Sequence, residues 1–105
     1  MKVSEYHKQG LKHFIEEPKD EWKKIGEAKE GAHRVAFYLT EDGKCVFNSS
    51  RRCRKLLAIA DFTCDFYNRE GRFPTQEEIL NFFAEERDRE KMKARIDIVS
   101  KALKG

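Results

Sequence analysis

The residues between positions 68 and 78 constrain the fold most, because they end one helix and begin another. Gly71 follows a polar helical end, and glycine readily adopts the left-handed conformation found after a last helical turn. Thr75 and Glu78 match a capping box, in which the threonine hydroxyl accepts from the third helical N–H and the glutamate reaches back to the cap. The segment predicts two successive helices joined by a short turn.

Three helical patterns fill the second half of the chain. The first begins near Asn48-Ser49-Ser50, which are good N-cap residues, and runs to about Asn68. Its apolar set is wide, which indicates a helix at the centre of the core. The second helix runs from Gln76 to about Glu86. Asp88 then caps the last helix, Arg89 to Lys104, whose predicted core face consists of Met92, Ile96, Val99 and Leu103.

Between residues 31 and 50 the apolar period changes from helical to alternating. Val35, Phe37 and Leu39 face one side, and a second short apolar run follows at residues 46–47. The dipeptide Asp42-Gly43 lies between the two runs and is typical of a tight hairpin turn. We therefore predict one antiparallel hairpin whose apolar face packs on the helices, because a two-stranded hairpin is marginally stable alone.

Before the hairpin, the pattern predicts two helices. The first covers residues 3–17 and ends at Pro18, because the residue before a proline is disfavoured in helical angles. Asp20 can cap a second, weaker helix over residues 21–29. The apolar stripe of the first helix consists of Val3, Tyr6, His7, Leu11, Phe14 and Ile15.

Composition favours one small globular domain. The chain has 105 residues, of which 39% are hydrophobic and 39% are charged. The predicted fold class is α+β and mostly helical, with N-terminal helices in residues 1–30, an antiparallel β-hairpin in 31–50 and a helix-turn-helix-like three-helix bundle in 51–105. No run approaches the roughly 18 apolar residues of a spanning helix, and the N-terminus lacks the apolar core of a signal peptide. We expect a cytoplasmic protein without a membrane partner.

The residue types that carry catalysis or bind metals are scattered. Cys45, Cys53 and Cys64 include no C-x-x-C pair, and the three histidines lack the spacing of helical metal ligands. The sequence has no phosphate loop and no nucleophile motif. We therefore predict free, mostly buried thiols, no metal, no cofactor and no enzymatic activity.

The distribution of charge indicates a partner more clearly. Residues 1–48 contain nine basic and nine acidic side chains, so the net charge of +3 arises in the second half. One basic cluster lies at the expected helix start, where the helix dipole already disfavours positive charge and free N–H groups bind anions. This cluster consists of Arg51, Arg52, Arg54 and Lys55, and a second one includes Lys91, Lys93, Arg95 and Lys101. Solvated helix faces are the alternative interpretation of both clusters.

The last half of the chain also resembles known DNA-binding domains. The phrase Gly71-Arg72-x-Pro74-Thr75-x-x-Glu78-Ile79, between two amphipathic helices, is similar to the helix-turn-helix entry of bacterial sigma factors. It also resembles the N-terminal winged-helix domain of the SOS-response repressor, and the resemblance covers about residues 56–105. It implies that the last helix enters the major groove, with Arg89, Lys91, Lys93 and Arg95 facing DNA, while the first helix start contacts phosphates.

Two functional hypotheses follow from these patterns. The first is a small DNA-binding regulator of transcription, expected to form a homodimer, whose partner is duplex DNA. Its predicted contact residues are Arg51, Arg52, Arg54, Lys55, Arg89, Lys91, Lys93, Arg95 and Lys101. The second is a protein-interaction module, such as a small phage or plasmid accessory inhibitor, because acidic side chains lie beside the proposed DNA surface. Its contacts would use Trp22, Phe73, Phe82, Glu85 or Glu86.

Overall fold

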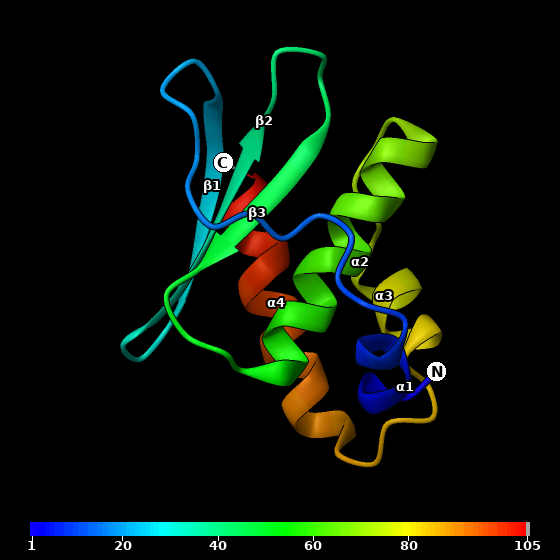
Figure 1. Cartoon of the computed structure of the whole chain (residues 1–105). Helices are drawn as coiled ribbons and strands as arrows, with labels where there is room; N and C mark the ends of the chain where they lie inside the picture. Colours follow the sequence, from blue (N-terminus) through cyan, green and yellow to red (C-terminus); the bar gives the residue numbers. More distant parts are fainter. Residues whose placement is uncertain (105) are drawn as a thin grey trace.

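The computed structural model describes residues 1–104, which form four helices and one three-stranded antiparallel sheet (Figure 1). The α+β class predicted from the sequence is confirmed. The elements follow in the order α1 (Val3–Lys8), β1 (Lys23–Glu30), β2 (His33–Leu39), β3 (Cys45–Ser49), α2 (Arg54–Glu70), α3 (Gln76–Phe82) and α4 (Arg89–Lys104).

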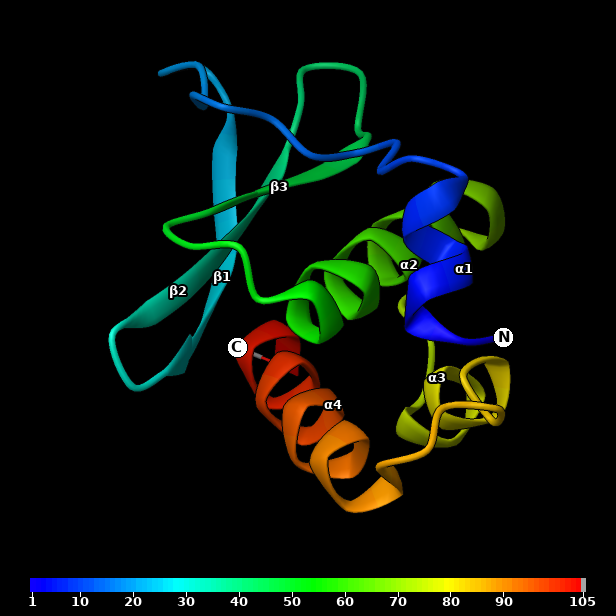
Figure 2. The same ribbon diagram turned by 60° about the horizontal axis from the view of Figure 1, so that its bottom comes forward.

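The sheet has the strand order β1-β2-β3 and packs one face against the helices. Val35 and Phe37 of β2 and Phe47 of β3 are fully buried in that face. Figures 1 and 2 show α4 beside β1 and α2 beside β3, so the two long helices cover the sheet together. The predicted turn between β2 and β3 is confirmed, with Gly43 at a φ of 80°.

The predicted helix over residues 21–29 is wrong, because this segment forms strand β1. It pairs with β2 along most of its length, from Lys23 opposite Leu39 to Glu30 opposite His33, with an irregularity near Gly26. A Cβ atom at Gly26 would lie 2.3 Å from the carbonyl oxygen of Ala102, so the strand runs against the end of α4. Tertiary pairing with β2 and α4 therefore overrides a weak helical pattern.

The first helix is also much shorter than predicted. α1 ends at Lys8, and Gly10 adopts a φ of 85°, which is the left-handed region that favours glycine. The chain then runs in an extended form, where the main chain of His13 and Ile15 bonds to Phe47 of β3. Hydrogen bonds to the edge of the sheet thus replace the expected helical continuation toward Pro18.

Asp61 holds this N-terminal segment on α2. Its side chain is completely buried and accepts hydrogen bonds from the Tyr6 hydroxyl at 2.6 Å and from the main-chain N–H groups of Lys12 and His13 at 2.9 and 2.7 Å. Burial, followed by the hydrogen bond to Asp61, raises the pKa of Tyr6, so its hydroxyl stays protonated and donates. A buried carboxylate with three donors is a satisfied structural group.

The three C-terminal helices largely follow the sequence. α3 begins with the predicted capping box but ends at Phe82, four residues before the predicted end near Glu86, whereas α4 begins and ends at the predicted residues. Met92, Ile96 and Val99 are buried as predicted, whereas Leu103 is half-buried. The predicted start of α2 near residues 48–50 is wrong, because Asn48 and Ser49 belong to β3 and Cys53 is the N-cap.

Candidate functional site

The start of α2 is a helix end without local stabilisation. Its N-cap residue, Cys53, makes no side-chain capping bond, and no acidic residue lies in the first turn. Arg54 and Lys55 occupy that turn instead, where the helix dipole disfavours a positive charge. The arrangement is one that a negatively charged ligand would stabilise.

Three arginines at this position are exposed to solvent. Arg51 and Arg52 lie in the segment just before α2, and Arg54 is its first residue. Among residues 1–104, no carboxylate lies within 4.0 Å of any of these guanidinium groups, although other cations of the chain have such partners. The charge at the start of α2 is therefore available to a partner.

The N-terminal segment brings more positive charge to this position. A hollow of about 300 Å³ is lined by Lys2, Val3, Ser4, Arg54, Lys55, Glu86 and Arg87. The imidazole Nε2 of His7 donates to the carbonyl oxygen of Arg54 at 2.8 Å, which fixes α1 beside the first turn of α2. Figure 1 shows the start of α1, the start of α2 and the loop before α4 together at the lower end of the molecule. We call Lys2, Arg51, Arg52, Arg54, Lys55 and Arg87 the basic end.

Within the basic end, Glu86 is the acidic side chain that organises the hollow. Its carboxylate accepts from the main-chain N–H of Val3 at 2.9 Å and lies 3.7 Å from the ammonium group of Lys55. Lys55 is thus partly neutralised, while Lys2 and Arg87 are exposed. Sequence reasoning missed Lys2 and Arg87, because Lys2 lies far from both clusters in the sequence, Arg87 lies between acidic residues, and only the tertiary fold brings them to α2.

The second predicted cluster, on α4, is largely neutralised by neighbouring carboxylates. Lys91 lies 3.8 Å from Asp88, Arg95 lies 3.3 Å from Glu30 of β1, and Lys101 lies 2.9 Å from Asp97. The Arg95 side chain is only 19% exposed.

The two remaining predicted basic residues on α4 are Arg89 and Lys93. Arg89 donates to the carbonyl oxygen of Ala84, and Lys93 is exposed. Lys93 lines a groove of about 450 Å³ between α3 and α4, whose other charged residues are Glu77, Glu90 and Asp97. Of the predicted basic residues, the structure therefore brings together mainly those at the start of α2.

No protein-family model, curated protein or solved structure matches this chain.

The aromatic residues expected to contact a protein partner are mostly used in the core. Phe73 stacks on Tyr67 with ring centroids 4.5 Å apart, and Phe82 stacks on Phe62 at 4.2 Å. Trp22 is half-buried and donates its indole N–H to Glu41 at 3.2 Å. Within residues 1–104, no large hydrophobic side chain is exposed, so an apolar docking patch is not evident on the described surface.

The described residues also contain no group of three His, Cys, Asp or Glu side chains arranged to hold a metal ion. None of the described helices has the length and apolar character needed to cross a membrane.

Proposed function

We propose that this protein binds nucleic acid, with duplex DNA as the partner, by contacting the phosphate backbone through the basic end. One observation carries the proposal: Arg51, Arg52 and Arg54 are exposed without carboxylate partners beside a helix start that has no cap. Guanidinium groups bind phosphate oxygens in bidentate fashion, and the free N–H groups of a helix start add to the attraction. A cytoplasmic location belongs to the same proposal, and the free thiols are consistent with it.

A helix-turn-helix role for α3 and α4 is the finer part of the proposal. It is supported by the packing of α2, α3 and α4 on one another and by the turn at residues 71–75. The ion pairs on α4 favour phosphate contact at the start of α2 as the main source of affinity, with base contacts through Arg89 and Lys93 as a smaller contribution. A small regulatory protein that acts as a homodimer fits this combination of phosphate and base contacts.

The test is a fluorescence anisotropy titration of a labelled random duplex at two salt concentrations. Phosphate contacts release counterions, so the affinity of the unmodified protein should fall steeply with salt. Replacing Arg51, Arg52 and Arg54 together by alanine should weaken binding on the order of 100-fold at low salt, at about 1 kcal/mol for each contact. The slope of log affinity against log salt should become shallower by about 3.

A matched control removes the same charge at a different place. Lys19, Lys23 and Lys44 are exposed and belong to the segment before β1, to β1 itself and to the turn before β3. Their triple alanine variant has the same net charge as the arginine variant and should retain near-normal affinity. Equal losses in both variants, or no binding by the unmodified protein at low salt, would contradict the proposal.

The groove between α3 and α4 supports a second candidate, a protein-interaction module. Three of its lining side chains, Glu77, Glu90 and Asp97, are acidic and would repel phosphate, whereas a basic segment of a protein partner would complement them. Capture of one stoichiometric protein that survives Arg51→Ala with Arg52→Ala, but not Glu77→Lys with Glu90→Lys, would favour this candidate.

A further inference from the structure

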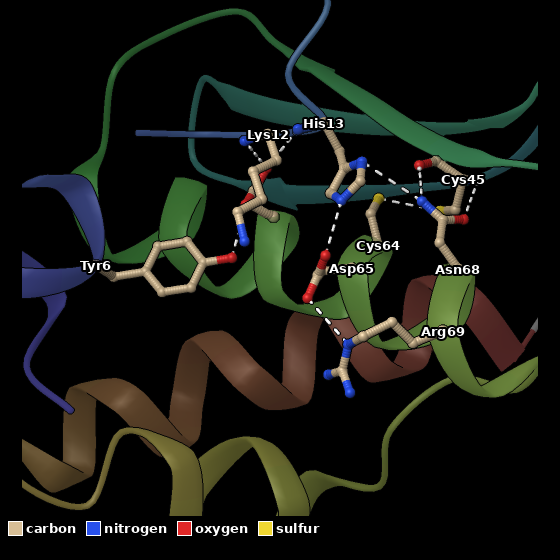
Figure 3. Close-up of polar contacts among 9 residues, drawn as sticks. Tyr6, Lys12, His13, Cys45, Cys64, Asp65, Asn68 and Arg69 are labelled. Carbon is tan, nitrogen blue, oxygen red and sulfur yellow. Dashed lines mark hydrogen bonds and ion pairs between the residues drawn. The ribbon is translucent and has the colours of Figure 1, made fainter. Parts of the chain in front are cut away.

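Two cysteines far apart in the sequence meet inside the fold. Cys45 lies on β3 and Cys64 on α2, and their sulfur atoms are 3.0 Å apart (Figure 3). Both residues are completely buried, and both are free thiols. The third cysteine, Cys53, is half-buried at the start of α2 and has no such neighbour.

A side chain one helical turn after Cys64 fixes the position of the pair. The Asn68 carbonyl oxygen accepts from the main-chain N–H of Cys45 at 2.7 Å, and its amide nitrogen donates to the main-chain carbonyl of Cys45 at 3.1 Å. β3 is therefore attached to α2 at the residue that carries the thiol. The two sulfur atoms are held facing each other by this double hydrogen bond.

His13 adds two hydrogen bonds around Asn68 and Asp65 of α2, as Figure 3 shows. Its Nδ1 accepts from the Asn68 amide at 3.4 Å, and its Nε2 donates to Asp65 at 3.1 Å. Although burial acts to raise it, the pKa of Asp65 is lowered by hydrogen bonds from His13 and Arg69, so the carboxylate stays charged and keeps accepting. This network holds Cys45 and Cys64 in fixed surroundings, so the two sulfur atoms stay close enough to form a crosslink once an oxidant reaches them.

We propose that Cys45 and Cys64 are a redox modification site that closes to a reversible disulfide between β3 and α2. With a peroxide as oxidant, one thiol is oxidised to a sulfenic acid and one water is released. The second thiol attacks that sulfur, forms the S–S bond and releases a second water. Two thiols and one peroxide thus give one disulfide and two waters, and a dithiol reductant reverses the change.

The two sulfur atoms need to move only a short distance to form the disulfide, but we expect the oxidation to be slow. A disulfide has an S–S distance of about 2.05 Å, so the sulfur atoms need to approach by about 1 Å. Burial, followed by the hydrogen bond with Cys45, raises the pKa of Cys64, and the thiolate is the reactive form. Oxidation should therefore wait for local opening and proceed slowly. Free thiols persist in a reducing cytosol, where disulfides are usually transient and redox-sensing.

The experiment uses the full chain with Cys53→Ala, which leaves the two buried thiols alone. The variant is treated with hydrogen peroxide, quenched, unfolded and alkylated with N-ethylmaleimide, and its intact mass is measured. We expect a monomer that has lost two hydrogen atoms and takes up no maleimide, whereas dithiothreitol treatment before alkylation restores two adducts. The crosslink closes a loop of residues 45–64, so the oxidised form should melt about 10 °C higher.

Two controls make the outcome decisive. The variant with Cys53→Ala and Cys64→Ser has one thiol and should form neither an internal crosslink nor the more stable species. Two maleimide adducts after peroxide, sulfinic or sulfonic acids, or crosslinked dimers would each overturn the proposal. The inference is independent of nucleic-acid binding, because its readouts are mass and melting temperature.

Discussion

The starts of α2 and α3 are built in opposite ways. At α3, the Thr75 hydroxyl accepts from the Glu78 N–H at 3.1 Å, and the Glu78 carboxylate accepts from the Thr75 N–H at 2.8 Å. Arg72 adds two further bonds to that carboxylate, at 2.9 and 3.0 Å. At α2, by contrast, Cys53 makes no side-chain cap bond, and the first turn contains Arg54 and Lys55 but no acidic residue.

The difference follows from how each helix is held. α3 has seven residues, and short helices are unstable without local bonds at their ends. α2 has 17 residues and carries nine buried side chains, so packing can stabilise it without a cap. The start of α3 is thus stabilised by hydrogen bonds between residues close in sequence, whereas α2 is stabilised by packing against the rest of the fold. A helix start that needs no cap leaves its N–H groups free for a ligand.

The largest expected effect comes from removing a tertiary contact of α2. Asp61→Ala leaves the Tyr6 hydroxyl and the N–H groups of Lys12 and His13 without their acceptor. We expect a loss of about 3 to 5 kcal/mol in the free energy of unfolding, measured by urea denaturation. The exposed Glu70→Ala should change that free energy by less than about 0.5 kcal/mol. Similar small losses in both variants would show that Asp61 does not fix the N-terminal segment.

The next effect is expected where β1 meets α4. Gly26→Ala places a Cβ atom 2.3 Å from the main-chain oxygen of Ala102, so the strand or the helix end must shift. A loss of about 2 to 3 kcal/mol should follow in the same urea measurement. Adding Ala102→Gly should not restore stability, because the obstacle is the main chain. A rescue by that second change would show that the side chain, rather than the backbone, sets the distance.

These two positions also show why part of the fold could not be predicted. Local signals sufficed for the α3 cap, the bounds of α4 and the turn at Gly43, because each depends on residues close in sequence. β1 depends on pairing with β2 and on contact with α4, and the end of α1 depends on Asp61, 48 residues beyond His13. A pattern of apolar spacing contains no information about such partners.

The candidate site likewise has some features that could be predicted from the sequence and others that could not. The arginine cluster was visible because its members are adjacent in the sequence, and the structure leaves three of them exposed. Lys2 and Arg87 were missed because they reach α2 only through folding. The carboxylates that pair with Lys91 and Lys101 lie within four residues along the chain, whereas the partner of Arg95 lies on β1. Charge runs therefore indicate where cations are, but they do not show which cations are neutralised.

A substitution at the α2 cap sharpens the comparison of the two helix starts. Cys53→Asp supplies the missing acceptor, and its negative charge suits the helix dipole, so the free energy of unfolding should rise by about 1 kcal/mol. The same charge should weaken duplex binding about 10-fold, because it lies beside Arg54. Cys53→Ser should give a similar stability gain with a smaller loss of affinity, because its hydroxyl occupies one helix N–H group but adds no negative charge. Equal affinity of the aspartate and serine variants would contradict an anion contact at the start of α2.

The smallest expected effect concerns the start of α3. The bond from Arg72, followed by that from the Thr75 N–H, lowers the pKa of Glu78 to about 2. A lowered pKa means that the stabilising contribution is present above the ordinary carboxyl value of about 4.3 and is lost as the pH falls through about 2. NMR titration of the side-chain carboxyl carbon should show a midpoint near 2 in the unmodified protein. In Arg72→Gln the midpoint should move toward the ordinary value, because the main-chain bond alone remains. A midpoint near 4.3 before any substitution would mean that the Arg72 bonds do not persist in solution, and the contrast between the two helix starts would then rest on the Thr75 cap alone.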